Sequence, residues 1–409
     1  MTDNTVLLVI FALTYAGLAI GRIPGLKLDR TGIAMLGAIA TMVFGGKSTG
    51  EIIGYIHWPT VLLLFGFFVL SAQLRLSGFF DRLASQLAGR LDHPVRFLFS
   101  LMLATASLSA FLNHDIVCLA FAPVVATAML RRSLNPVPYM VALAISSNIG
   151  AAATLVGNPQ DMLIGQVAGL GFGHYALWSL VPVLFALLAA FCLIWLLSRN
   201  HLALAGTTTV VPPGPAFSYD RAHTIKGLVI LALVIGLFFT PLPMELVALT
   251  AAAIHLASRK FQTEELLRWV DWPILVLFMS LFVVTGAFET TGYGEQAVGW
   301  LGRASIHLDS LPTLAVVTAG LSNLVNNSAA VILLLKVGDV AHAPAAYVLA
   351  LANSFGGSLI IVGSVSNIIV VQQARAIGVD ISFREYARLG VPVTLTALAG
   401  LIGWVWLVT

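Results

Sequence analysis

The stretch that decides the fold is long, apolar and polar in its middle: PVPYMVALAISSNIGAAATLVGNPQDMLIGQVAGL (136–170). As one continuous helix it would reach about 52 Å, well beyond a hydrocarbon core of about 30 Å. Pro159 lacks a backbone N–H and disfavours helix at Asn158. Irregular backbone inside a membrane is tolerated only within protein or beside a water-filled cavity. The stretch therefore predicts a broken membrane helix over 136–168.

The composition places the whole chain in a membrane. Of 409 residues, 59% are hydrophobic and 10% are charged, whereas soluble domains carry about 25% charged residues. The net charge of +3 does not indicate nucleic-acid binding, because Lys and Arg lie in short connectors rather than on one face. We expect an all-α polytopic membrane protein with about ten transmembrane helices, at 5–21, 31–46, 57–74, 136–168, 176–198, 224–240, 245–258, 272–289, 345–371 and 389–408.

Two further apolar stretches, 97–130 and 310–340, are interrupted by polar residues at their midpoints. If each enters the membrane and leaves on the same side, all but three of the 21 Lys and Arg residues fall on one side. The three exceptions are Lys47, Arg303 and Lys336. Positive charge accumulates on cytoplasmic loops. The charge distribution thus predicts two re-entrant hairpins and both termini outside. We also expect a plasma (inner) membrane location.

An internal repeat links the two halves of the chain. LSAFLNHD (108–115) matches LSNLVNNS (321–328), and SSNIGAAATLVG (146–157) matches ANSFGGSLIIVG (352–363). The matching blocks occur in the same order, and each half holds an odd number of spans, so the second copy is expected to be inverted. Inverted repeats with interrupted helices are typical of secondary transporters. The alignment sets Asn113 against Asn326, Gly150 against Gly356 and Gly157 against Gly363.

The proline-containing connector 200–222 divides these repeats and is expected to be a cytoplasmic linker. Residues 1–199 would form the first repeat and residues 223–409 the second. Within them we expect scaffold helices in 5–74, hairpins at 97–130 and 310–340, broken helices at 136–168 and 345–371, and a helix at 176–198.

Polar residues at the hairpin tips and helix breaks are the candidate site. Opened helix ends attract anions at their N–H groups and cations at their C=O groups. Asp115 and Asp161 are the carboxylates within these clusters, and an intramembrane acid is a functional candidate by default, although structural pairing is the alternative for both. The candidate solute-binding residues are Asn113, His114, Asn148, Gly150, Thr154, Asn158, Asn326, Asn327, Ser328, Asn353, Ser354 and Gly356.

FLNHDIVCLAFAPVV (111–125) and SNIGAAATLVGNPQDMLIG (147–165) resemble the ion transporter superfamily, in particular its ArsB/P-protein branch of arsenite and antimonite permeases. The sequence departs from the family pattern at Gln160, where a second proline is usual, and at Asp161, where Asn is usual. The resemblance implies a homodimer with a static scaffold, to which 31–46 and 245–258 would contribute. It also implies an elevator-like transport domain and, as in some arsenite systems, an ATPase subunit.

These features favour proton-coupled efflux of arsenite or antimonite, without a further cofactor. As(OH)3 is uncharged at neutral pH, and the clusters contain amides and hydroxyls but no Lys or Arg. Asp115 would then carry the proton. The alternatives are a sodium- or proton-coupled carrier of a di- or tricarboxylate, and a sodium/proton antiporter using Asp115 and Asp161. A channel fits the duplicated tips less well, and a membrane enzyme is disfavoured because neither HExxH nor GxSxG occurs.

Overall fold

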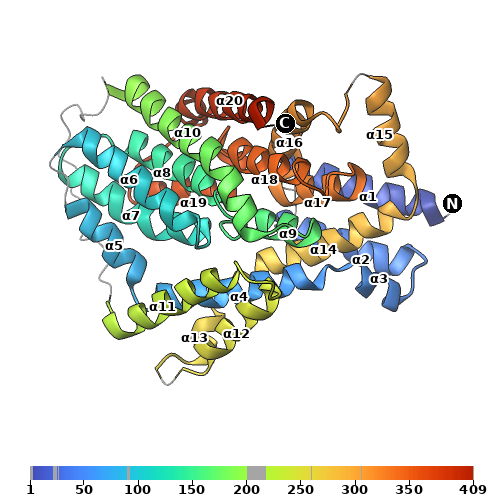
Figure 1. Ribbon diagram of the computed structural model, residues 1–409, viewed down its shortest axis with the longest axis horizontal. Coiled ribbons are helices and arrows are strands. Elements are labelled where there is room, and N and C mark those ends of the chain that lie inside the picture. Colours follow the sequence, from blue (N-terminus) through green and yellow to red (C-terminus); the bar gives the residue numbers. More distant parts are fainter. Residues whose placement is uncertain are drawn as a thin grey trace.

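The computed structural model describes residues 3–21, 25, 27–89, 93–199, 218–258, 260–304 and 306–408. These residues form helices joined by turns, without a β-strand in the described ranges (Figure 1). The all-α prediction is therefore confirmed. Five helices, α4, α7, α10, α14 and α20, are long and apolar enough to cross a membrane, and seven shorter apolar helices accompany them.

The helices follow one another in the same order in the two halves of the chain. The first half contains α1 (Asp3–Ile20), α2 (Arg30–Phe44), α3 (Thr49–Tyr55), α4 (Trp58–Leu76), α5 (Phe79–Gly89), α6 (Pro94–Ser109), α7 (His114–Arg131), α8 (Pro136–Ala151), α9 (Pro159–Val167) and α10 (Phe172–Ser198). The second half contains α11 (Arg221–Leu237), α12 (Met244–Leu256), α13 (Thr263–Leu267), α14 (Trp272–Glu289), α15 (Tyr293–Arg303), α16 (Leu311–Val325), α17 (Asn327–Val337), α18 (Ala345–Gly356), the 3₁₀ turn η2 (Ile361–Gly363), α19 (Val365–Ala376) and α20 (Phe383–Val408).

The two interrupted stretches each fold as a pair of contacting helices. Residues 97–130 lie in α6 and α7, which a short turn joins at 110–113. Residues 310–340 lie in α16 and α17, which meet at Asn326. The broken helices are also interrupted where polar residues and glycines cluster, between α8 and α9 and between α18 and α19.

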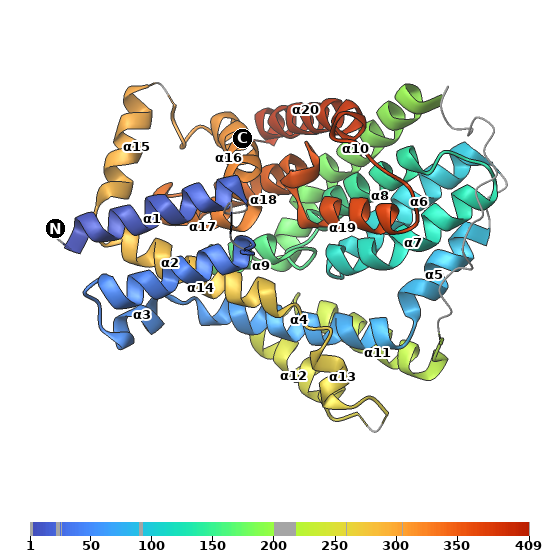
Figure 2. The same cartoon turned by 180° about the vertical axis from the view of Figure 1, so that it is seen from behind.

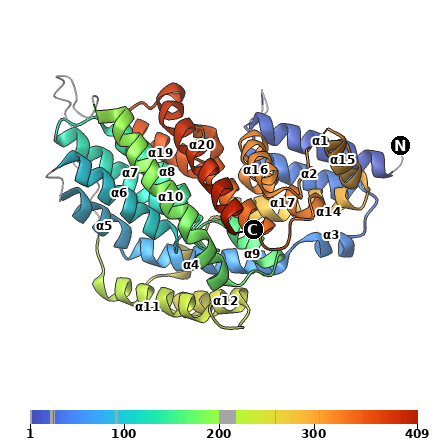
Figure 3. The same cartoon turned by 45° about the horizontal axis from the view of Figure 1, so that its top comes forward.

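The halves are interlocked rather than side by side. In the first half α2 packs along α14 of the second, and in return α12 packs along α4 (Figure 2). A Cβ on Gly66 would lie 2.7 Å from the backbone of Ala248, so glycine permits the close crossing of α4 and α12. Short α9 contacts α4, α17 and α18 at the centre of the molecule (Figure 3).

Four short helices, α3, α5, α13 and α15, lie in connectors between the long apolar runs and were not predicted. They are amphipathic or capped segments; in α5, for example, Phe80 and Ala84 are buried while the remainder is partly exposed. Most of the linker expected at 200–222 lies outside the described residues, which resume at Ser218.

Candidate functional site

The two hairpin tips are built in the same way. The Asn113 Oδ1 accepts the backbone N–H of Asp115 at 2.9 Å, and the Asn326 Oδ1 accepts that of Ser328 at 2.8 Å. Each asparagine thus caps the second arm of its hairpin. Asn326 has a φ of 132° and a ψ of 147°, a backbone region that residues other than glycine rarely adopt. Asn113 and Asn326 are candidate solute-binding residues, but their side-chain oxygens are used for these caps. The amide nitrogen of Asn113 has no partner among the described residues.

The breaks provide two more helix beginnings. Asn158 caps α9, since its Oδ1 accepts the N–H of Asp161 at 2.8 Å. Ser364 stands at the equivalent position before α19 and makes no such side-chain bond. Four helices, α7, α9, α17 and α19, therefore begin at the tips and breaks.

All four of these helix N-termini open onto one small cavity. Its lining includes the first residues of each helix, together with Ile274 and Leu277 of α14 and Arg30 of α2. About 40 Å³ is open to the centres of water molecules, so this conformation has room for a few waters but not for a larger solute. A helix N-terminus carries roughly half a positive elementary charge. The helix-start residues in the lining are His114, Asp115, Pro159, Gln160, Asn327, Ser328, Ser364 and Val365.

One hydrogen bond joins each hairpin tip to the broken helix of the other half. The Gln160 Nε2 donates to the Ser328 Oγ at 2.8 Å, and the Ser366 Oγ donates to the Asp115 Oδ1 at 2.5 Å. The repeat alignment sets Gln160 against Ser366 and Ser328 against Asp115. These two contacts are therefore copies of each other.

A second matched pair connects the broken helices directly. The Asn148 Nδ2 donates to the Asn367 Oδ1 at 2.8 Å. At the equivalent place the Ser354 Oγ donates to the Asp161 Oδ2 at 3.5 Å. The interactions around the cavity thus follow an approximate two-fold arrangement.

The two candidate coupling carboxylates occupy different environments. Asp115 lines the cavity, and its Oδ1 lies 3.6 Å from the His114 Nε2. Asp161 is fully buried behind the cavity lining, where its Oδ2 accepts the Asn158 Nδ2 at 2.6 Å. Its Oδ1 has no partner among the described residues.

Several other predicted site residues pack behind the cavity. A Cβ on Gly150 would overlap the backbone of Ala106, and one on Gly356 would lie 2.9 Å from the Cα of Ala319. Thr154 donates to the carbonyl of Ala110. The amide of Asn353 is buried, and neither of its polar atoms has a partner among the described residues.

Sequence reasoning missed two kinds of lining residue. Ser364 and Ser366 could have been found, because the repeat alignment sets them against Asn158 and Gln160. Arg30 could not, since in the sequence it is one of several basic residues in a connector, and its place at the cavity depends on the packing of α2 against α14. The site is thus not free of fixed positive charge.

Asp271 caps α14 close to the cavity, its Oδ1 accepting the N–H of Ile274 at 3.2 Å. Burial, together with the nearby charge of Asp115, raises the pKa of Asp271 to about 6. This carboxyl therefore titrates nearer to neutrality than an ordinary aspartate.

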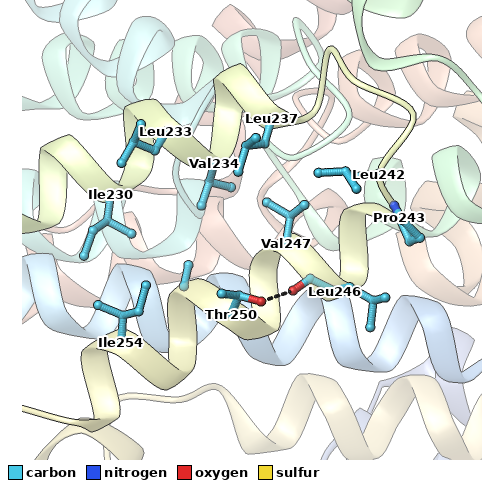
Figure 4. A pocket seen from close by; sticks show the side chains of 11 residues that line it. Ile230, Leu233, Val234, Leu237, Leu242, Pro243, Leu246, Val247, Thr250 and Ile254 are labelled. Carbon is cyan, nitrogen blue, oxygen red and sulfur yellow. Dashed lines mark hydrogen bonds between the residues drawn. The ribbon is translucent and has the colours of Figure 1, made fainter.

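A separate pocket between α11 and α12 has a different chemistry. Aliphatic side chains dominate it, and the hydroxyl of Thr250 is bonded to the carbonyl of Leu246 (Figure 4). A site of this kind has little with which to orient a polar solute. The cavity at the helix N-termini is accordingly the candidate solute site.

Interlocked halves, paired hairpins and broken helices define this protein as a multi-pass membrane transporter. Residues 6–352 match the CitMHS family model, described as "Citrate transporter". The chain belongs to this family, within the ion transporter superfamily that the sequence motifs resemble. Its place in the ArsB branch of that superfamily stays a prediction.

Relatives extend over nearly the whole chain. "Uncharacterized transporter Rv2685" of Mycobacterium tuberculosis is 30% identical over 99% of this chain and 98% of its own length. "Silicon efflux transporter LSI3" of Oryza sativa is 25% identical, covering 92% of each chain. "Putative transporter arsB" of Dictyostelium discoideum is 22% identical, covering 91% of this chain and 86% of its own.

Two solved structures have a similar fold. The YdaH transporter of Alcanivorax borkumensis aligns with a TM-score of 0.60 and 15% identity, over 100% of this chain and 98% of its own. MtrF of Neisseria gonorrhoeae aligns with a TM-score of 0.61 and 11% identity, over 99% and 94%. At these identities the likeness concerns the fold alone.

Proposed function

We propose that this protein is a secondary active carrier of a small anion, of the di- or tricarboxylate class, which binds where the four helix N-termini meet. The observation that carries the proposal is their convergence on one cavity. Backbone N–H groups and aligned helix dipoles make such ends ready anion sites, even within a membrane. The family description, "Citrate transporter", names a solute of the same charge class.

Efflux of arsenite or antimonite is the second candidate. The cavity also offers amides and hydroxyls, on Gln160, Asn327, Ser328 and Ser364, which match the OH groups of a neutral hydroxide. Relatives named for arsB and for silicon efflux support this reading. The positive ends of the four helices and the Arg30 guanidinium, set against the Asp115 carboxylate, favour the anion.

Asp115 is the proposed coupling residue, taking up a proton as the solute binds or leaves. Its support is its position, since it is the carboxylate that lines the cavity. Asp161, buried nearby with one oxygen unpartnered among the described residues, would hold the ion if the coupling ion is sodium. The hairpins and broken helices would move together as an elevator against the interlocked helices α2, α4, α12 and α14, in a homodimer. A partner ATPase is proposed only for the arsenite candidate.

Transport in proteoliposomes tests the solute. The purified protein is reconstituted, and uptake of radiolabelled citrate and succinate is compared with that of arsenite under an imposed pH gradient and then a sodium gradient. The anion proposal predicts gradient-driven accumulation of a carboxylate that excess arsenite does not inhibit. Accumulation of arsenite without carboxylate transport would establish the second candidate instead. Failure to move any of these solutes would contradict both.

A further inference from the structure

A positive side chain reaches the cavity from outside the repeated tips and breaks. Of the described residues that line the cavity, Arg30 is the only Lys or Arg. It is the first residue of α2, a helix that packs along α14 and α1. The candidate site therefore combines the four helix N-termini with the Arg30 guanidinium and the Asp115 carboxylate.

The position of Arg30 is defined by its neighbours. Asp29 caps α2, since its Oδ1 accepts the N–H of Gly32 at 2.8 Å, and its side chain is exposed. The guanidinium of Arg30 lies over Gly21 at the end of α1, where a Cβ would be 3.7 Å from the Nε and 3.9 Å from the Nη2. Gly21 has a φ of 76°, so a glycine there suits both the backbone turn and the space for the guanidinium.

Arg30 forms no ion pair with a carboxylate of the described residues. The described ion pairs join other residues, such as Lys336 with Glu289 and Arg375 with Asp380. Asp115 lines the same cavity, but its carboxylate contacts Ser366 and His114. A half-buried guanidinium that no described carboxylate pairs with is suited to bind an anion, because its planar N–H groups match two carboxylate oxygens at once.

We propose that Arg30 is the residue by which the site recognises the charge of its solute, pairing with one carboxylate group while the helix N-termini hold another. This assignment rests on the anion carrier proposed above. Under this assignment, the residue that sets the selectivity for the solute lies on α2, outside the hairpin tips and the helix breaks. The repeat shapes the cavity, and a side chain of α2 distinguishes an anion from a neutral hydroxide of similar size.

The test compares Arg30→Gln and Arg30→Lys with a matched control, Lys27→Gln, which removes an exposed cation three residues earlier. Equilibrium binding of radiolabelled citrate to each purified protein is measured together with its thermal midpoint. Loss of a charge-assisted pair predicts that Arg30→Gln weakens citrate binding by about 10- to 100-fold. Arg30→Lys keeps the charge but loses the two-pronged geometry, so its affinity should lie in between, and Lys27→Gln should bind as the wild type does.

Each outcome has a distinct meaning. Wild-type citrate affinity in a folded Arg30→Gln protein would overturn the assignment of Arg30 and leave the anion carrier standing. Equal loss in Arg30→Gln and Lys27→Gln would also overturn it, because general surface charge would then be the cause. If the Arg30→Gln protein melts early, the Arg30→Lys variant decides, since unchanged affinity there contradicts the two-pronged contact. Absence of citrate binding in the wild type would overturn the proposed function, and with it the anion assigned to Arg30.

Discussion

The two halves of the chain share the backbone arrangement of their hairpin tip and helix break. They differ in the charge of the side chains placed there. In both halves an asparagine at the tip caps the second helix of the hairpin, and a glycine of the broken helix packs against the first. Each tip also forms a hydrogen bond with the broken helix of the other half. Yet Asp115 corresponds to Ser328, and Asp161 corresponds to Asn367. Residues common to both copies shape the cavity, and the carboxylates that could couple an ion lie in the first copy.

The largest effect is expected where the two copies differ in charge. Asp115→Asn removes a group able to exchange a proton, so accumulation of citrate under a pH gradient should fall to the level seen without the gradient. Ser328→Ala, at the corresponding position, should retain pH dependence. Uptake into proteoliposomes with and without a pH gradient measures both variants. Full pH-driven accumulation by Asp115→Asn would show that the proton is carried elsewhere.

A second comparison concerns the glycines that both copies share. Alanine at Gly150 would overlap the backbone of Ala106, whereas at Gly356 its Cβ would lie 2.9 Å from the Cα of Ala319. Overpacking costs about 1–3 kcal/mol, and we expect Gly150→Ala near the top of that range and Gly356→Ala near the bottom. Thermal midpoints in detergent measure the difference. Gly54→Ala, where nothing lies within 4 Å of the added Cβ, is the control and should not destabilise the protein. A reversed order of Gly150 and Gly356 would contradict the packing account.

The smallest effect is expected at the caps of α4 and α14, which carry His57 and Asp271 at corresponding positions. Burial raises the pKa of Asp271 to about 6 from its ordinary value of 3.8. Between these values the folded protein holds a proton that the unfolded chain has lost, so stability falls as the pH rises through this interval. Asp271→Asn keeps the capping oxygen and should remove about 1 kcal/mol of this pH dependence, allowing for partial exposure. Thermal midpoints from pH 4 to pH 7 test it, and an unchanged slope in the variant would refute the shift.

The sequence predicted the interruptions better than the residues that face the cavity. Pro159 and the polar residues around Asn113 and Asn326 act on their own backbone, so the breaks and turns can be inferred from local chemistry. The pairing of Ser366 with Asp115 can be inferred only if the alignment of the two halves is extended beyond Gly363, where the matched block ends. Arg30 reaches the cavity because α2 packs along α14, and no local pattern carries that tertiary contact. The amphipathic helices α5 and α15 were missed because they are too short and polar to resemble spans.

The central claim is that one solute cavity is built from both halves. Single cysteines at Gln160 and Asn327, in a background with Cys118 and Cys192 replaced by alanine, can be labelled with a negatively charged methanethiosulfonate, with and without citrate. The account predicts that both cysteines react and that citrate slows both reactions over the same concentration range. Protection of the cysteine of one half alone, or no reaction at either position, would contradict it.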